Sequence, residues 1–194
     1  TRDALIKLAR KVALNGTLEV IPAAEPVSAD KWSTAIGNAR TAWARERAGI
    51  LEGIEALTQG AAEKKNILAA NAYKPDYTAR YTSTFENWLR QGIPSAGLMS
   101  ESWFRYFTLD YMTKKAKKGL ADSVAGTMSG FTLLNDLEEL ANLAETMTDG
   151  YRYAFAMYVR EEFSRRAYAA GTQSYDDLLY HVAKPLEESG SSLQ

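Results

Sequence analysis

The feature that most constrains the fold of this chain is the spacing of its apolar residues, which recur at steps of three and four. The longest run of this kind comprises Leu133, Leu137, Leu140, Ala144, Met147, Tyr151, Ala154 and Tyr158. Such spacing places its members on one stripe of an α-helix, which is normally the buried stripe. If Gly150 does not break it, the run predicts one helix over residues 132–170, ended by Gly171.

A second long run of the same period predicts another helix that begins after Ser28 or Asp30, both suitable N-caps. Its apolar residues are Trp32, Ile36, Ala39, Trp43, Ile50, Ile54, Leu57 and Ala61. Gly37, Gly49 and Gly53 lie within it, and each weakens an isolated helix by about 1 kcal/mol relative to Ala. They indicate either close approach of another backbone or a break near Gly49, and we favour close packing.

Shorter helical patterns account for most of the remaining chain. They predict helices at residues 2–14, 60–72, 76–91, 100–118 and 174–184. Residues 17–28 contain Pro22 and Pro26, which forbid a regular helix, so we expect an extended arm there. The Gly- and Ser-rich residues 119–131 predict a loop, and residues 189–194 predict a short flexible tail.

The fold class follows from these patterns. The short LEVI sequence at residues 18–21 is the only stretch that resembles β-strand alternation. We therefore predict an all-α fold, a single-domain bundle of about six or seven helices over residues 1–188. The length of 194 residues suits one such domain.

Composition excludes several kinds of chemistry. The chain has no cysteine and one histidine, His181, so disulfides, thiolate nucleophiles and Cys/His zinc sites are excluded. A net charge of −1 gives no overall attraction to nucleic acid or anionic lipid. No apolar run approaches the roughly 18 residues that a membrane span needs, which predicts a soluble protein. Thr1 is consistent with removal of an initiator Met or of a targeting segment.

His181 is the main catalytic candidate in the sequence. Asp177 lies one helical turn before it, and Ser174 would complete a hydrolytic triad on paper. The sequence has no Gly-x-Ser-x-Gly elbow to present a nucleophile. The acidic residues Asp136 and Glu139 share the polar side of an amphipathic helix, which favours a solvated face over a metal site. We predict no catalytic residue and no metal site, with activity based on carboxylates or His181 as the residual alternative.

Tyrosines that fall outside the apolar stripes are candidates for a partner interface. They are Tyr73, Tyr77, Tyr81, Tyr106, Tyr168 and Tyr175. Exposed tyrosine and tryptophan are enriched at the centres of protein interfaces. A basic cluster before Gly119 is assigned to the same interface, and it comprises Lys114, Lys115, Lys117 and Lys118.

Two segments of the chain resemble each other. Phe104-Arg105-Tyr106 with Tyr111-Met112 matches Tyr151-Arg152-Tyr153 with Tyr158-Val159 in residue type and spacing. Duplication of a two-helix unit would produce this match, and so would chance. Repeats of this kind are common in scaffolding proteins that bridge similar partners.

These observations predict a non-enzymatic structural protein, a helical scaffold or linker subunit packed inside a larger multiprotein complex. Two alternatives stay open. One is a virion or phage coat-type subunit, the only case in which we expect contact with nucleic acid. The other is a helical bundle that holds an apolar ligand or pigment. No cofactor is predicted, although a bound pigment or lipid stays open, and the sequence leaves the partner, the compartment and homomeric or heteromeric assembly undetermined.

Overall fold

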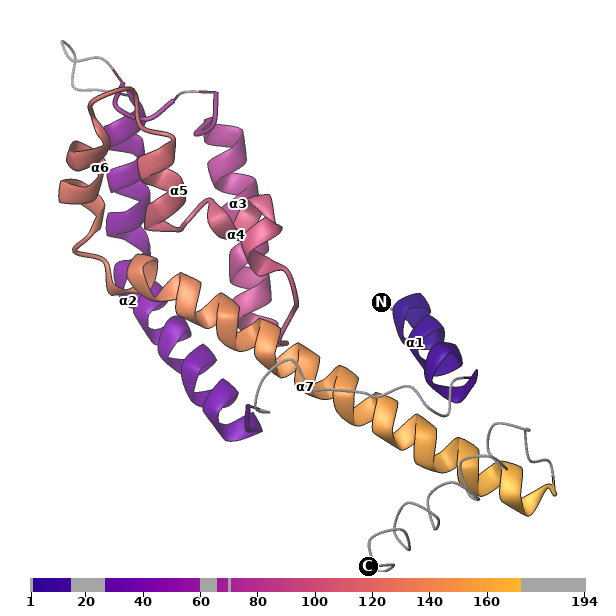
Figure 1. The fold of residues 1–194 in the computed structure, drawn as a ribbon. Helices are drawn as coiled ribbons and strands as arrows, with labels where there is room; N and C mark the ends of the chain where they lie inside the picture. Colours follow the sequence, from indigo (N-terminus) through magenta and orange to yellow (C-terminus); the bar gives the residue numbers. More distant parts are fainter. Residues whose placement is uncertain (1, 15–26, 60–65, 70, 172–194) are drawn as a thin grey trace, which may run out of the picture. The chain divides into compact units, whose positions relative to one another are not determined.

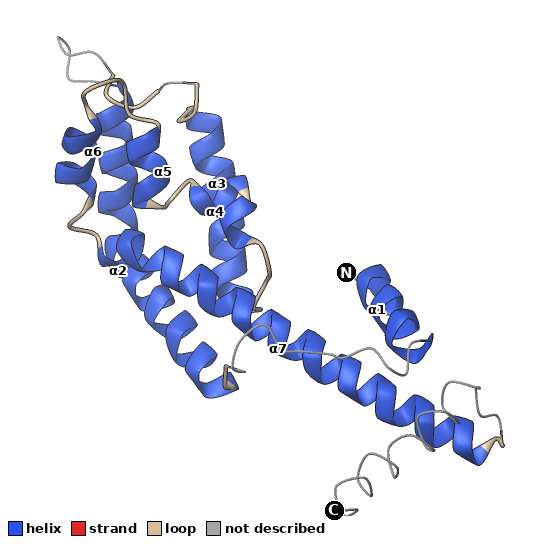
Figure 2. Ribbon diagram, in the orientation of Figure 1, coloured by secondary structure: helices blue, strands red, loops and turns tan. Residues whose placement is uncertain are grey.

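The computed structural model describes residues 2–14, 27–59, 66–69 and 71–171, which are mainly helical (Figures 1 and 2). The elements are α1 (Arg2–Leu14), α2 (Ala29–Gln59), α3 (Pro75–Gln91), the short 3-10 helix η1 (Leu98–Ser100), α4 (Ser102–Arg105), α5 (Leu109–Lys114), α6 (Ala121–Met128) and α7 (Thr132–Ala169). Within these described ranges there is no strand, only an isolated antiparallel bridge between Leu68 and Ala116. The predicted all-α class is confirmed.

Contacts divide the chain into two compact units, which we describe separately. The main bundle comprises residues 26–148, from α2 to the first half of α7. The terminal unit comprises residues 1–25 and 149–194, and its described part consists of α1 and the second half of α7. The prediction of a single domain over residues 1–188 stays a prediction.

The core of the main bundle is rich in aromatic rings. In this bundle α2 packs against α3 and α6, while α4 packs against α3 (Figure 1). Trp43 of α2 contacts Phe85 of α3 and Phe107 edge-on, with ring centroids 5.0 and 5.4 Å apart. The ring planes of Trp88 and Phe104 lie at 90° to each other, and their ring centroids are 5.4 Å apart. Edge-to-face pairs contribute about 0.5–1.5 kcal/mol each beyond the burial of their area, so this cluster is central to the stability of the bundle.

The two long predicted helices are present as α2 and α7. α2 begins after Ser28, whose hydroxyl accepts a hydrogen bond from the Lys31 N–H at 3.2 Å, as an N-cap does. α7 continues through Gly150 without a break, and Gly171 follows it with a φ of 63°. Long periodic runs therefore predict the framework of the bundle correctly.

The glycines of α2 have the predicted packing role at two of three positions. A Cβ atom on Gly49 would lie 2.9 Å from the Phe131 ring, and one on Gly53 would lie 2.7 Å from Met128 Sδ. The close approach therefore comes from side chains at the end of α6 and in the α6–α7 turn, not from another backbone. Nothing lies within 4 Å of a Cβ on Gly37, so nothing in the structure explains that glycine.

Three shorter predictions are wrong. The described residues of the predicted helix at 60–72 are not helical, because the Ala69 N–H and the Ile67 carbonyl bond to Lys115 and Lys117 instead (3.0 and 2.9 Å). The predicted helix at 100–118 is divided into α4 and α5, and Thr108 caps α5 by accepting a hydrogen bond from Tyr111 N–H. The predicted loop at 119–131 contains α6.

The predictions of one helix at 100–118 and of a loop at 119–131 failed because the helices in these segments are short. α6 has eight residues and buries only Val124 and Met128 fully, so its apolar period is too brief to stand out from a Gly- and Ser-rich composition. The resemblance between residues 104–112 and 151–159 also has no structural counterpart. The first segment consists of α4, a connection and α5, whereas the second lies inside the continuous helix α7.

Side chains of α2 satisfy the free ends of two other helices. Arg40 donates to the carbonyls of Leu89 and Arg90 at 2.6 and 3.0 Å, and Trp32 Nε1 donates to the Gly92 carbonyl at 2.7 Å. These carbonyls belong to the C-terminal end of α3, where a cation also opposes the helix dipole. Gly92 has a φ of 65°, which a residue with a Cβ rarely adopts.

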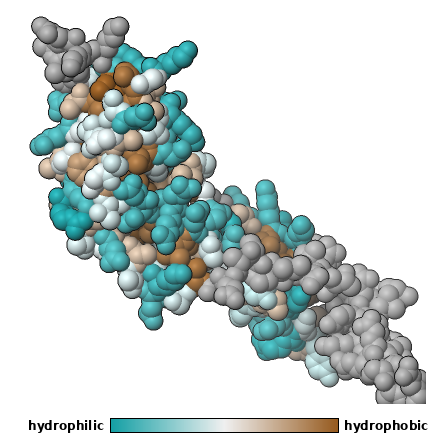
Figure 3. Space-filling model, turned by 60° about the vertical axis from the view of Figure 1, so that its left-hand side comes forward, coloured by the Kyte–Doolittle hydropathy of each residue, from teal (hydrophilic) through white to brown (hydrophobic). Residues whose placement is uncertain are grey.

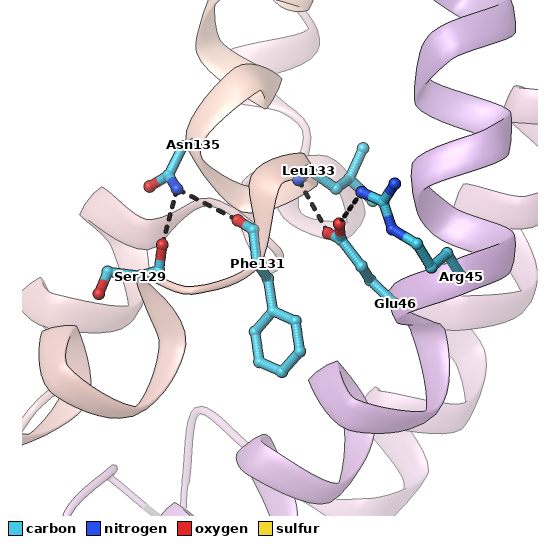
Figure 4. Close-up of polar contacts among 6 residues, drawn as sticks. All are labelled: Arg45, Glu46, Ser129, Phe131, Leu133 and Asn135. Atoms are coloured by element: carbon cyan, nitrogen blue, oxygen red, sulfur yellow. Dashed lines mark hydrogen bonds and ion pairs between the residues drawn. The ribbon is translucent and has the colours of Figure 1, made fainter.

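At the other helix end, Glu46 accepts a hydrogen bond from the Leu133 N–H at 3.0 Å and is also paired with Arg45 (Figure 4). This contact occupies a free N–H of the first turn of α7. Asn135 stabilises the turn between α6 and α7, because its Nδ2 donates hydrogen bonds to the carbonyls of Ser129 and Phe131 at 2.9 and 3.2 Å (Figure 4). The α6–α7 turn is therefore held from both sides.

In the terminal unit, Val12 and Ala156 are buried and most other described side chains are exposed or half-buried. The predicted helix at residues 2–14 is confirmed as α1. The predicted extended arm falls mostly on residues outside the described ranges. The same holds for the predicted helix at 174–184 and for the tail at 189–194.

Candidate functional site

Two of the tyrosines assigned to a surface interface lie in the core instead. Tyr73 and Tyr106 are each 1% exposed, and their ring centroids are 4.5 Å apart. The Tyr73 hydroxyl donates to the Tyr106 carbonyl at 3.1 Å. The surface assignment is wrong for both. Tyr73 precedes α3 and Tyr106 directly follows the four-residue α4, so neither belongs to a helix long enough for apolar periodicity to show which side is buried.

The buried phenols are not suited to acid–base chemistry near neutral pH. Burial raises the pKa of Tyr106 to about 12, although its hydrogen bond with the Thr78 hydroxyl at 2.5 Å opposes the shift. Burial also raises the pKa of Tyr73 well above its ordinary value. Both groups therefore stay protonated and act as structural hydrogen-bonding partners.

Tyr77 and Tyr81 are half-buried and lie next to each other on α3. Their ring centroids are 5.9 Å apart, and the Arg80 guanidinium lies over both rings at 5.2 and 5.0 Å. Lys74 Nζ also lies 5.6 Å from the Tyr77 ring. These two tyrosines already have partners within the chain, so they are weaker interface candidates than the sequence suggests.

The basic cluster is divided by local pairing. Lys114 donates to Asp110 at 2.7 Å, and Lys115 lies 5.4 Å from the Tyr111 ring. Lys117 and Lys118 are exposed. Lys114 is exposed too, but its charge is paired with Asp110, so the cluster presents two exposed lysines without an ion pair among the described residues and not a continuous basic patch of four.

The second half of α7 carries the most exposed aromatic residues in the described part of the chain. Tyr151 is 56% exposed, Tyr158 is 61% exposed, Phe163 is 44% exposed and Tyr168 is 78% exposed. We call these four residues the α7 aromatic face, a name for the exposed segment as a whole, since at about 100° per residue Phe163 and Tyr168 lie roughly 120° and 100° to either side of Tyr151. Tyr158 lies seven positions, or about two turns, after Tyr151, so these two side chains point from the same side of the helix. Tyr168 was assigned to an interface from the sequence, and its exposure agrees with that assignment, while Tyr175 lies outside the described residues.

Sequence reasoning placed Tyr151 and Tyr158 on a buried stripe and missed Phe163. The stripe is buried up to Met147, but further along the helix Ala156 is the buried residue and Ala154 is exposed. The composition of this segment could have indicated that the aromatic residues are exposed, because charged residues lie close to them and few aliphatic side chains accompany them.

Most charged side chains around the α7 aromatic face are paired with one another. Glu162 accepts hydrogen bonds from Arg165 at 2.8 and 2.9 Å and from Arg166 at 2.7 Å. These two guanidinium groups lower the pKa of Glu162 to about 2. Arg152 donates to Asp149 at 2.7 Å. The aromatic rings are thus accompanied by ion pairs and not by a field of one sign.

The main bundle contains a cleft of about 490 Å³, which we call the α2–α3 cleft. Its apolar walls include Leu51 and Ile54 of α2, Tyr73, and Ala79 of α3. At its edge Arg47 Nε donates to Glu86 Oε1 at 2.6 Å, and Trp43 Nε1 donates to the same oxygen at 3.3 Å. On the side drawn in Figure 3, hydrophobic areas of the bundle are small and lie between hydrophilic ones.

The remaining sites considered from the sequence are the residues around His181 and the acidic residues of α7. His181, Asp177 and Ser174 lie outside the described residues. Asp136 and Glu139 are exposed on α7, and no group of three acidic or metal-ligating side chains occurs among the residues that the structure describes. In the same ranges, every helix is too short or too polar to cross a bilayer.

Comparison with known proteins gives no match. No family model fits the chain, and neither a curated protein nor a solved structure resembles it significantly. The residues and their geometry alone carry the functional argument.

Proposed function

We propose that this chain is a non-enzymatic assembly subunit that binds another protein through the α7 aromatic face. The observation that carries the proposal is the exposure of Tyr151, Tyr158, Phe163 and Tyr168, which ranges from 44% to 78% along one helix. Tyrosine and phenylalanine bring large, stiff contact areas, and they are enriched where protein interfaces are fully buried.

The charges of this segment favour a protein partner over a nucleic acid. Phosphate binding needs guanidinium or ammonium groups that face the ligand. Here Arg165 and Arg166 both bond to Glu162, and Arg152 bonds to Asp149. Aromatic rings surrounded by paired charges resemble the anatomy of a protein interface with a polar rim. This reasoning supports a scaffold or linker subunit over a coat protein that packages nucleic acid.

The experiment is sedimentation of the native protein from the cells that produce it, with a Tyr151→Ser/Tyr158→Ser double variant beside the wild type. We expect the wild type in a particle far heavier than its own 21.5 kDa, and the double variant in lighter fractions. Both tyrosines are exposed, so we expect the melting temperature to change little.

An Ala154→Ser/Glu161→Ser variant is the matched control, because it alters two other exposed positions of the same helix without removing a ring. It should sediment like the wild type. Migration of the wild type as a 21.5 kDa monomer would contradict the proposal, and so would unchanged sedimentation of the tyrosine variant. Collapse of the particle on nuclease treatment would instead support the coat-type alternative.

A further inference from the structure

We infer that the α2–α3 cleft is a binding site for a small, uncharged amphipathic molecule, with an apolar body and a hydrogen-bond acceptor such as a carbonyl group. This inference is independent of the proposed assembly role, since the cleft lies in the main bundle and uses none of the residues of the α7 aromatic face. Three observations support it: the size and walls of the cleft, the unused donors of Arg47, and the hydroxyl of Thr82.

The size and walls of the cleft suit a small organic molecule. Sites for such ligands commonly have volumes of about 300–1,000 Å³, with apolar walls and a few placed polar groups. The cleft has about 490 Å³ and is walled in part by Leu51, Ile54, Ala79 and the buried Tyr73. Ile54 and Tyr73 are already buried, whereas a ligand body placed against the half-buried Leu51 and the exposed Ala79 would remove apolar surface from water.

Arg47 offers hydrogen-bond donors in a fixed orientation. Its Nε is held by Glu86, which is held in turn by the Trp43 indole. The two terminal amino groups of Arg47 have no hydrogen-bond partner among the described residues, so their N–H groups are available to an acceptor. Because Glu86 neutralises the guanidinium charge, the edge of the cleft favours an uncharged acceptor over a carboxylate or phosphate.

Thr82 provides an unsatisfied polar group in the wall of the same cleft. It is 5% exposed, and its hydroxyl has no partner within the described part of the chain. Other helical threonines donate to the carbonyl four residues earlier, and they include Thr41, Thr58, Thr78, Thr84, Thr127 and Thr146. A buried hydroxyl without a partner is costly, and a polar group on a bound molecule can provide one.

The test is a fluorescence titration of the full chain with Nile red, an uncharged dye that has an apolar aromatic body and a carbonyl group. We expect saturable binding at one site, with emission shifted to shorter wavelength. Ala79→Trp should weaken binding at least tenfold, because the indole occupies the cleft from an exposed helical position. Arg47→Met should weaken binding about three- to tenfold, as loss of a hydrogen bond predicts.

Ala44→Trp is the matched control, since Ala44 is an exposed residue of α2 that does not line the cleft. It should bind the dye like the wild type, and so should the Tyr151→Ser/Tyr158→Ser variant. Circular dichroism and thermal melting confirm that each variant is folded. Absence of saturable binding to the wild type, or unchanged binding by Ala79→Trp, would overturn the inference. Tighter binding of the anionic dye anilinonaphthalene sulfonate than of Nile red would overturn its assignment to an uncharged ligand.

Discussion

Glu46 on α2 accepts a hydrogen bond from the backbone N–H of Leu133, a residue 87 positions later in the chain. The contact occupies a backbone N–H in the first turn of α7, the kind of group that a capping side chain satisfies. Only three and seven residues further along α2, Gly49 and Gly53 leave room for Phe131 and Met128. One stretch of α2 therefore fixes both the start of α7 and the turn that leads into it.

Glu46→Ala should destabilise the main bundle by about 1 kcal/mol, the usual effect of losing an N-terminal cap. Glu46→Gln keeps an acceptor oxygen and should cost less. Urea denaturation followed by circular dichroism measures both variants. Equal stability of the wild type and Glu46→Ala would show that the hydrogen bond makes no net contribution.

The same contact should make stability depend on pH in the acid range. Desolvation alone would raise the pKa of Glu46, but the hydrogen bonds from Arg45 and Leu133 outweigh it and lower the pKa below its ordinary 4.5. The unfolded chain therefore takes up the proton more readily, so the contribution of Glu46 is present above about pH 4.5 and is lost as the pH falls through the folded value. Denaturation curves of the wild type and Glu46→Ala should converge under acid conditions, and a gap that persists there would contradict this account.

Replacement of the α2 glycines should change stability in opposite directions. Gly37→Ala should stabilise the protein by about 0.5–1 kcal/mol, because a methyl group there meets nothing and alanine favours the helix. Gly49→Ala should destabilise it by about 1–2 kcal/mol, because the new Cβ would lie 2.9 Å from the Phe131 ring. Thermal melting of the two variants distinguishes them. A stabilised Gly49→Ala protein would mean that the ring moves aside freely.

Thr82 and Thr78 should respond differently to replacement by valine, although they are one turn apart on α3. Thr82→Val removes a buried hydroxyl that has no partner among the described residues, so we expect unchanged or slightly higher stability. Thr78→Val removes the hydrogen bond with the Tyr106 hydroxyl at 2.5 Å and should cost about 1 kcal/mol. Chemical denaturation provides both values, and a clear loss of stability in Thr82→Val would reveal a partner for its hydroxyl.

Ionisation of Tyr106 should limit stability in alkaline solution. Its folded pKa of about 12 lies above the ordinary 10.0, mainly because burial disfavours the phenolate. The unfolded chain loses this proton first, so the contribution of Tyr106 is complete below about pH 10 and declines as the pH rises toward 12. Tyr106→Phe cannot ionise there, so its stability should fall less steeply over that range, as measured by denaturation at successive pH values. Parallel curves for the two proteins would contradict this expectation.

The long elements were predictable from the sequence because periodicity accumulates over many turns. α2 and the first half of α7 bury the residues that their spacing selects, such as Trp43, Ile54 and Leu137. The second half of α7 keeps the helix but loses the burial, since Tyr151 and Tyr158 follow the period and are exposed. A period shows which residues share a face, but only tertiary structure decides whether that face is covered.

The candidate sites were less predictable than the framework. Tyr73 and Tyr106 are buried by contacts between a turn and a short helix, which no local pattern encodes. The α2–α3 cleft depends on how two helices are spaced, and its Arg47–Glu86 pair joins residues 39 positions apart. A single sequence contains no direct signal for such distant pairings.

The capping of α3 and α7 by side chains of α2 has a consequence for how the main bundle unfolds. Detachment of α2 would expose the carbonyls that Arg40 and Trp32 satisfy at the end of α3 and, at the same moment, the Leu133 N–H that Glu46 satisfies. Two other helices would then lose their ends together with their shared core. A partly folded intermediate that lacks only α2 is therefore disfavoured, and the main bundle should open and close as one cooperative unit.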